Sequence, residues 1–124
     1  MSNEKIAIRS YKDLIVYQKA YALCIDVYAG TKEYPRNEEF GLVSQVRRAA
    51  VSIPSNIAEG YRRKNKKDYI HFLRIALGSL AEVETQVSLS IDMNFMKKEI
   101  GEAILKKAES IGQMLYKLIA SLDK

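Results

Sequence analysis

The stretch GLVSQVRRAAVSIPSNIAEGYRR, residues 41–63, places apolar side chains alternately three and four residues apart. Because an α-helix completes a turn every 3.6 residues, this spacing gathers the side chains on one helical face. The stripe consists of Val43, Val46, Ala50, Ile53 and Ile57. We predict a helix over residues 38–60.

Pro54 falls inside this helix. There it removes one backbone hydrogen bond and crowds the carbonyl of Ala50, at a cost of about 3 kcal/mol or more. We expect a bend at Pro54, with the freed carbonyls satisfied by the side chains of Ser52, Ser55 and Asn56. We therefore interpret the proline as a structural residue.

The rest of the chain shows the same helical spacing, and only two prolines and six glycines interrupt its 124 residues. We predict three further helices over residues 12–33, 66–92 and 96–122. Similar lengths and short connections favour an all-α fold, an up-down-up-down antiparallel four-helix bundle. We expect one domain over 1–124, with 1–10 as a flexible N-terminal extension. A solenoid of two helical hairpins is the weaker alternative, because no internal repeat is visible.

Several residues predict where the helices begin and end. Pro35 is expected to terminate the first helix, and Asn37 to cap the second. Gly60 suits a left-handed cap at the end of the second helix. Asn65 should cap the third helix, with Asp68 in its first turn. A further break is expected at Asn94.

Two features suggest that this bundle contacts other subunits. The helix over 12–33 carries two neighbouring apolar stripes, so it should bury more than one face. The helices over 38–60 and 66–92 each carry a polar face of mostly small residues, whereas the helix over 96–122 carries the Lys and Glu usual on exposed faces. These polar faces are either solvated or meet neighbouring subunits, with Arg47 or Arg48 paired to Glu82 or Glu84. The candidate interface residues are Arg47, Arg48, Ser52, Ser55, Ser79, Glu82, Glu84 and Gln86.

The sequence contains few side chains of the types that enzymes use for catalysis. The one histidine, His71, sits one step off an apolar stripe, and we interpret it as structural. Cys24 falls on an apolar stripe, which favours a packed side chain over a nucleophile. Glycine-rich phosphate loops and Glu-x-x-His metal pairs are absent. We expect no enzyme, cofactor or metal; an enzyme using His71 or Cys24 is a distant alternative.

The composition indicates the cellular compartment of the protein and the class of partner that it could bind. A single cysteine rules out an internal disulfide and suits a reducing environment. Residues 1–10 lack the apolar core of a signal peptide, and no run approaches the ~20 apolar residues of a membrane span. We therefore predict a cytoplasmic protein. The net charge of +5, from 20 Lys and Arg against 15 Asp and Glu, permits an anionic partner without requiring one.

Five cations lie within six residues where the second predicted helix meets the third. We call this cluster the basic corner; it consists of Arg62, Arg63, Lys64, Lys66 and Lys67. Such a run is either a solvated loop or a phosphate-binding surface, and in a ring of subunits its copies would form a basic rim. Tyr61 and Tyr69 flank it and could stack on unpaired bases, although Tyr69 suits the core better.

The segments YKDLIVYQKAYAL (11–23), GLVSQVRRAAVSIPSNIAEGYRR (41–63) and GSLAEVETQ (78–86) also carry a family resemblance. The chain resembles, from about Tyr11 to Leu122, the four-helix-bundle proteins of the 23S rRNA intervening-sequence family. The motif RRAAVSIPSNIAEG is its most specific part, whereas the last helix follows only the general apolar pattern. Tyr17 stands where the family commonly has tryptophan.

This resemblance implies a bacterial homo-oligomer, typically a pentamer, without known catalytic activity. Accessory proteins of diversity-generating retroelements are similar, and in them a basic barrel binds a reverse transcriptase and nucleic acid. We therefore expect a non-enzymatic oligomeric accessory protein that binds RNA or another nucleic acid, alone or within a ribonucleoprotein or reverse transcriptase complex. The alternative is a protein-interaction scaffold that binds no nucleic acid.

Overall fold

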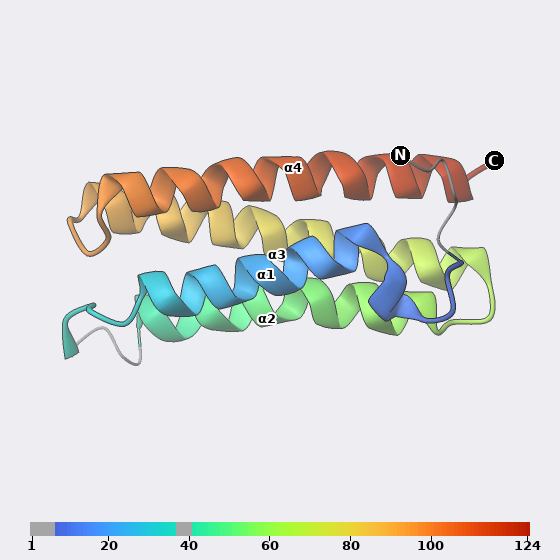
Figure 1. The fold of residues 1–124 in the computed structure, drawn as a ribbon, viewed down its shortest axis with the longest axis horizontal. Coiled ribbons are helices and arrows are strands. Elements are labelled where there is room, and N and C mark those ends of the chain that lie inside the picture. The colour runs from blue at the N-terminus through green and yellow to red at the C-terminus, as the bar shows by residue number, and fades with distance from the viewer. Residues whose placement is uncertain (1–6, 37–40) are drawn as a thin grey trace.

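The computed structural model describes residues 7–36 and 41–124. These residues form a short 3-10 helix, η1 (Tyr11–Asp13), and four α-helices, with no β-strand among them. The α-helices are α1 (Ile15–Gly30), α2 (Leu42–Tyr61), α3 (Lys66–Asp92) and α4 (Lys98–Leu122). The prediction of an all-α fold with four helices is confirmed. In Figure 1 consecutive helices run in opposite directions along the long axis of the molecule.

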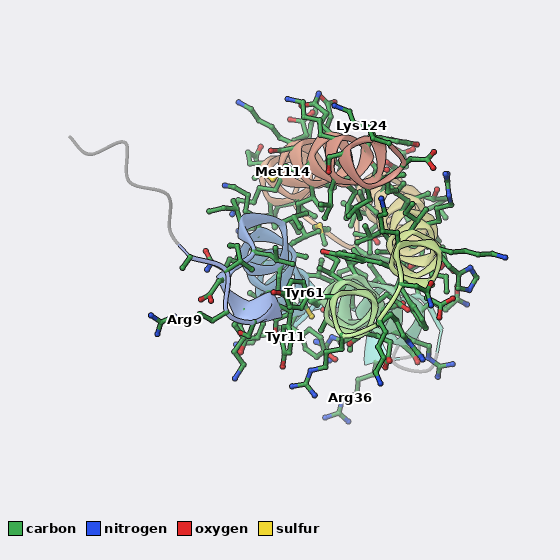
Figure 2. All side chains as sticks on the ribbon, turned by 90° about the vertical axis from the view of Figure 1, so that its right-hand side faces the viewer. Arg9, Tyr11, Arg36, Tyr61, Met114 and Lys124 are labelled. Atoms are coloured by element: carbon green, nitrogen blue, oxygen red, sulfur yellow. The ribbon has the colours of Figure 1, made fainter. Side chains whose placement is uncertain are left out.

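Each helix packs against two neighbours. The contacts run from α1 to α2, α2 to α3, α3 to α4 and back to α1, and within the described residues the Cα atoms of diagonal helices stay more than 8 Å apart. Figure 2, viewed along the bundle, shows the helices at four corners around a shared interior. Apolar stripes from all four helices meet there, including Leu23, Ile53, Leu73 and Leu115, which are fully buried. Burial of these stripes is the main force that holds the helices together.

The first helix is shorter than the predicted range of 12–33. At its start, Ser10 caps η1 and the Asp13 carboxylate accepts from the Ser10 N–H, after which Leu14 leaves the helical conformation. At its end, the Thr31 hydroxyl donates to the carbonyl of Val27 at 2.9 Å. This bond satisfies a carbonyl of the last turn, so α1 ends at Gly30 and Pro35 lies beyond its end.

Helix α2 continues through Pro54. The Ser55 hydroxyl donates to the Val51 carbonyl and the Asn56 amide to the Ser52 carbonyl, both at 2.8 Å. Ser55 and Asn56 thus bond to the two carbonyls that follow Ala50, whereas the Ser52 hydroxyl accepts from Asn56 and Ser79 and bonds to no carbonyl. The prediction that these side chains satisfy the carbonyl freed by Pro54 is therefore wrong for the Ala50 carbonyl.

The prediction that Gly60 forms a left-handed cap is wrong. No described glycine has a positive φ, and Gly60 is buried inside α2. A Cβ atom there would lie 2.9 Å from the Cβ of Phe72 on α3. The glycine is therefore needed for close packing between the two helices, which sequence spacing does not reveal.

The remaining helix ends follow the sequence closely. Asn65 caps α3 by accepting from the Asp68 N–H at 2.8 Å, and Asn94 adopts a φ of +62° at the next break, so both predictions are confirmed. Helix α4 starts at Lys98, two residues later than predicted, because Met96 is buried in the turn and Lys97 is extended. The proposed cap Asn37, and residues 38–40 of the second predicted helix, lie outside the described residues.

In the part of the chain that the structure describes, no helix combines the length and the apolar character needed to cross a lipid bilayer.

Candidate nucleic-acid interface and subunit surfaces

The basic corner joins α2 to α3 at one end of the bundle (right-hand end of Figure 1). The backbone N–H of Arg62 donates to the carbonyl of Ala58, and that of Arg63 to the carbonyl of Gly60, which ends α2. Lys66 and Lys67 form the first turn of α3. All five side chains of the corner are exposed. The corner therefore presents its charge to solvent.

The two arginines of the corner rest on aromatic rings. The Arg62 guanidinium lies 5.4 Å from the ring centroid of Tyr11, and that of Arg63 lies 4.7 Å from the centroid of Phe72. Arg63 also pairs with the Glu59 carboxylate at 3.0 Å. Because this ion pair is largely exposed, it contributes little to stability. These contacts orient the arginines without removing them from solvent.

The three lysines are less constrained. The Lys66 ammonium donates to the main-chain oxygen of Lys124 at 3.4 Å. Lys64 and Lys67 have no ion-pair or hydrogen-bond partner within 7–36 and 41–124. The adjacent acid, Asp68, is engaged by the Asn65 amide at 3.3 Å. Positive charge at the corner is therefore only partly balanced, and the N-terminal end of α3 adds a dipole that also favours anions.

Chain segments that the sequence does not connect also reach this end of the bundle. Tyr11 comes from η1 and Lys124 follows α4, and Figure 2 labels both at the end that faces the viewer. No sequence signal marks either residue, because only the fold brings them to the corner. Tyr69 packs edge-on against Tyr61 with centroids 6.1 Å apart, and burial raises the pKa of the Tyr69 hydroxyl. Tyr69 is thus partly buried and packs against the core, in line with its position in the sequence.

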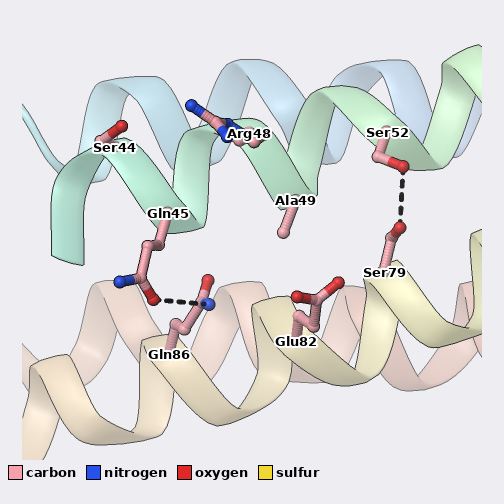
Figure 3. Close-up of a pocket in the computed structure, with 8 residues that line it drawn as sticks. All are labelled: Ser44, Gln45, Arg48, Ala49, Ser52, Ser79, Glu82 and Gln86. Carbon is pink, nitrogen blue, oxygen red and sulfur yellow. Dashed lines mark hydrogen bonds between the residues drawn. The ribbon is translucent and has the colours of Figure 1, made fainter. Parts of the chain in front are cut away.

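A second surface feature is a hollow of about 530 Å³ between α2 and α3, which we call the polar groove (Figure 3). It is lined by Ser44, Gln45, Arg48, Ala49, Ser52, Ser79, Glu82 and Gln86. The Ser79 hydroxyl donates to that of Ser52 at 2.8 Å, and the Gln86 amide reaches Gln45 at 3.5 Å. Arg48 and Glu82 form no ion pair with each other, and the side-chain oxygen of Gln86 is buried without a hydrogen-bond partner in the described chain.

In the structure, the predicted interface residues fall into two groups that lie on different parts of the surface. Arg48, Ser52, Ser79, Glu82 and Gln86 meet in the polar groove.

The other three lie elsewhere. The Arg47 side chain turns toward α1, donates to the Thr31 hydroxyl at 2.9 Å and covers the ring of Tyr28. Ser55 lies on the α1 side of α2, and Glu84 does not line the groove. Neighbouring arginines in the sequence thus serve different faces of the bundle.

The third feature is a hollow of about 420 Å³ between α1 and α2, which we call the apolar groove. Its lining contains no charged residue and consists of Tyr11, Tyr17, Tyr21, Cys24, Ile25, Val51, Pro54, Ser55 and Ala58. Tyr21 is 54% exposed and Ile25 is 57% exposed. The stripe of α1 with Leu23 and Val27 fills the core. In the second stripe, Tyr17 is half-buried against the core, whereas Tyr21 and Tyr28 are exposed on the single chain.

The two candidate nucleophile or acid–base residues lie apart. Cys24 is half-buried in the apolar groove, where desolvation raises the pKa of its thiol and disfavours the reactive thiolate. His71 is exposed on α3, with its ring against that of Phe72. Among the described residues, no group of three His, Cys, Asp or Glu side chains could hold a metal ion.

Comparison with known proteins places the chain in a family. No curated protein matches it. A crystal structure from Bacteroides thetaiotaomicron, of a protein with unknown function from the S23 ribosomal protein family, is 26% identical with a TM-score of 0.79. The match covers 85% of this chain and 98% of the other. The family model for the 23S rRNA-intervening sequence protein matches residues 12–117. Since that match spans most of the chain, the protein belongs to the family of 23S rRNA-intervening sequence proteins.

Proposed function

We propose that this protein is a non-enzymatic accessory protein that assembles into a homo-oligomer and binds RNA or another nucleic acid through the basic corner. The observation that carries this proposal is the exposure of five cations at one end of the bundle, of which only Arg63 pairs with a carboxylate among the described residues. The partner is a nucleic acid alone or within a ribonucleoprotein or reverse transcriptase complex.

The physical basis is phosphate neutralisation. Each Lys or Arg that neutralises a phosphate releases condensed counterions, so the contacts add up and weaken steeply with salt. Such contacts position a protein on the backbone without reading sequence. In a closed oligomer, every subunit presents the same corner, which multiplies the contacts that one strand can make. The resemblance of the chain to pentameric proteins supports a ring of five.

A second function is a protein-interaction scaffold that binds no nucleic acid. The apolar groove favours it, because a surface hollow without charge, flanked by exposed Tyr21 and Ile25, is suited to a protein partner. The two functions differ in whether the protein responds to a polyanion.

A filter-binding titration separates these two functions. Single-stranded RNA and DNA are titrated with the protein at about 50 mM and about 200 mM salt, a range over which phosphate-dominated affinity changes by orders of magnitude. We expect binding that weakens steeply with salt and varies little with base sequence. Absence of binding at the lower salt concentration would favour the scaffold. Light scattering at micromolar concentration reports the oligomeric state independently.

A further inference from the structure

We infer that the basic corner binds single-stranded RNA or DNA in preference to a duplex, because Arg62 and Arg63 are each held against an aromatic ring and stack on unpaired bases. This inference rests on the proposed function and specifies the class of nucleic acid that the corner takes. The ligand is a sugar–phosphate strand whose bases are free to contact the protein with their faces.

Two arginine–aromatic pairs meet at the corner. Arg62 and Arg63 are consecutive residues, so their Cα atoms lie about 3.8 Å apart. The ring beneath Arg62 belongs to Tyr11, with 5.4 Å between guanidinium and ring centroid, and the ring beneath Arg63 belongs to Phe72, at 4.7 Å. Tyr11 comes from η1 and Phe72 from α3. The fold thus brings separate elements together to position two neighbouring guanidinium groups.

The guanidinium groups remain accessible although they contact rings. Both arginines are exposed, and the Arg63 side chain keeps 43% of its surface accessible beside its ion pair with Glu59. That ion pair uses Nη2, at the edge of the guanidinium, whereas a base stacks on the face of such a group. Arg62 has no carboxylate partner in the described part of the chain. Each arginine can therefore stack on a base and still donate to a phosphate.

Further aromatic side chains flank the two pairs. Tyr61 directly precedes the arginines, is partly exposed and packs edge-on against Tyr69. His71 is exposed on α3, with its ring 5.5 Å from that of Phe72. Figure 2 labels Tyr61 and Tyr11 next to each other at the end of the bundle that faces the viewer. Rings and cations are therefore mixed at this end, which is the composition of surfaces that bind single strands by stacking and charge.

Charge alone would produce the opposite preference. A duplex carries one phosphate charge per about 1.7 Å of its axis and releases more counterions per contact than a single strand, so a purely electrostatic surface favours the duplex. Stacking reverses this order. Bases in a duplex are paired and stacked on one another, so they offer a protein only their edges, whereas unpaired bases also offer their faces. The preference between the two forms therefore tests whether the rings take part in binding.

A third arginine–aromatic pair provides an internal comparison. Arg47 covers the ring of Tyr28 at 4.7 Å, the same distance as between Arg63 and Phe72. This pair lies near the end of α1, at the end of the bundle opposite the basic corner (Figure 1). The Arg47 Nε atom also donates to the Thr31 hydroxyl at 2.9 Å, which ties the guanidinium to α1. Tyr28 therefore serves as the control position for the rings of the corner.

Fluorescence anisotropy with four labelled probes at low salt tests the inference on the unmodified protein. The probes are a DNA strand of ~12 nucleotides, within the ~4–16 that single-strand sites span, an RNA strand of the same sequence, a DNA duplex of the same length, and an abasic strand that keeps the phosphates without bases. We expect both base-bearing strands to bind about tenfold or more tightly than the duplex and the abasic strand, since a stacked base contributes at least about that factor.

A variant without the two supporting rings tests the residues. Tyr11→Leu combined with Phe72→Leu keeps apolar bulk and all cations of the corner. Affinity for the base-bearing strands should fall about tenfold, whereas affinity for the duplex and the abasic strand should not change. The matched control, Tyr28→Leu, removes the ring beneath an arginine outside the corner and should leave every affinity unchanged. Circular dichroism and light scattering verify the fold and the oligomeric state of each variant.

The outcomes separate this inference from the proposed function. If the duplex or the abasic strand binds the unmodified protein as tightly as the base-bearing strands, stacking is excluded, while phosphate binding by the basic corner stands. An equal loss for all probes in the double variant, or the same loss in Tyr28→Leu, would also overturn the inference. Absence of binding to every probe would overturn the inference and the proposed function together. The RNA and DNA strands show which of the two the corner prefers, and either preference over the duplex supports the inference.

Discussion

The two connections that flank α3 are similarly short but have opposite characters. Residues 62–65 join α2 to α3 and are exposed and basic. Residues 93–97 join α3 to α4 and bury Met96, which is 5% exposed. In this second connection, the ring of Phe95 packs at a tilt against that of Tyr34 with centroids 5.6 Å apart, and the Phe95 N–H donates to the carbonyl of Ser90 at 2.9 Å.

The difference indicates which connection stabilises the fold and which is available for binding. Burial of Met96 and Phe95 contributes to the hydrophobic stabilisation of the bundle. Exposed charges at the basic corner contribute little, because water solvates them in both the folded and the unfolded state. Changes at the corner should therefore affect binding, and changes in the connection 93–97 should affect stability.

The largest effect is expected when the five residues of the basic corner are changed to Gln. RNA affinity at low salt should fall about a thousandfold, or about 4 kcal/mol, because several phosphates lose their cationic partners together. The salt slope should fall by about one unit for each phosphate that is no longer neutralised. Filter binding measures both quantities, and circular dichroism should show an unchanged fold.

The matched control for this variant changes five lysines of the last helix and its cap to Gln. These are Lys97, Lys98, Lys106, Lys107 and Lys117. The reduction in net charge is identical, but these lysines alternate with acids along α4, and Lys107 already pairs with Asp26. Affinity should fall much less. Equal reductions of affinity in the two variants would mean that net charge, and not the corner, determines binding.

Met96→Ala should lower stability and leave RNA affinity unchanged, which is the opposite of the effect expected at the basic corner. Truncating this buried side chain leaves a cavity and should lower the free energy of unfolding by about 2–4 kcal/mol. Urea denaturation measures this decrease, and the RNA affinity of the folded protein should not change. A stable Met96→Ala variant would contradict the structural role assigned to the connection 93–97.

The two asparagines at these connections act for different reasons, so a different substitution should preserve the stability at each. Asn94 has a φ of +62°, so Asn94→Ala should cost about 1 kcal/mol of strain, whereas Asn94→Gly should cost almost nothing. Asn65 acts through its side chain as the cap of α3, so Asn65→Ala should cost about 1 kcal/mol and Asn65→Asp should be tolerated. Thermal unfolding of the four variants measures this pattern, and equal effects of Ala and Gly at Asn94 would exclude backbone strain.

The smallest effect is expected at the exposed ion pair between Arg63 and Glu59. Glu59→Gln should change the free energy of unfolding by less than about 0.5 kcal/mol. The same change removes an anion beside the corner and should slightly strengthen RNA binding. A clear decrease in RNA affinity would contradict the assignment of Arg63 to phosphate contact.

Much of the fold could be predicted from signals that act between neighbouring residues in the sequence. The third helix was predicted over 66–92 and is observed over Lys66–Asp92, because the cap Asn65 and the break at Asn94 both act through their own backbone neighbours. The end of α1 was predicted three residues too late, because the helix ends at Gly30, where the Thr31 hydroxyl donates to the Val27 carbonyl, and not at Pro35. The spacing of apolar residues does not show where such a side-chain bond accompanies the end of a helix.

At the candidate surfaces, too, features formed by neighbouring residues could be predicted, whereas features formed by distant residues could not. The basic corner could be identified from the sequence because its five cations are adjacent in the chain and follow a helix end. That Tyr11 and Lys124 also reach the corner could not be predicted, since they are brought there from distant parts of the chain. The candidate interface residues could be named in advance, but their division between faces could not be predicted.

The sequence by itself determined the helical class, the position of the basic corner and the presence of a second apolar stripe on the first helix. These properties follow from spacing along the chain, which fixes the face of each helix. Only the tertiary structure decided which faces meet. It buried Gly60 against Phe72, and it placed Arg47 beside α1 and Arg48 in the polar groove, because successive residues of a helix point about 100° apart toward different neighbours.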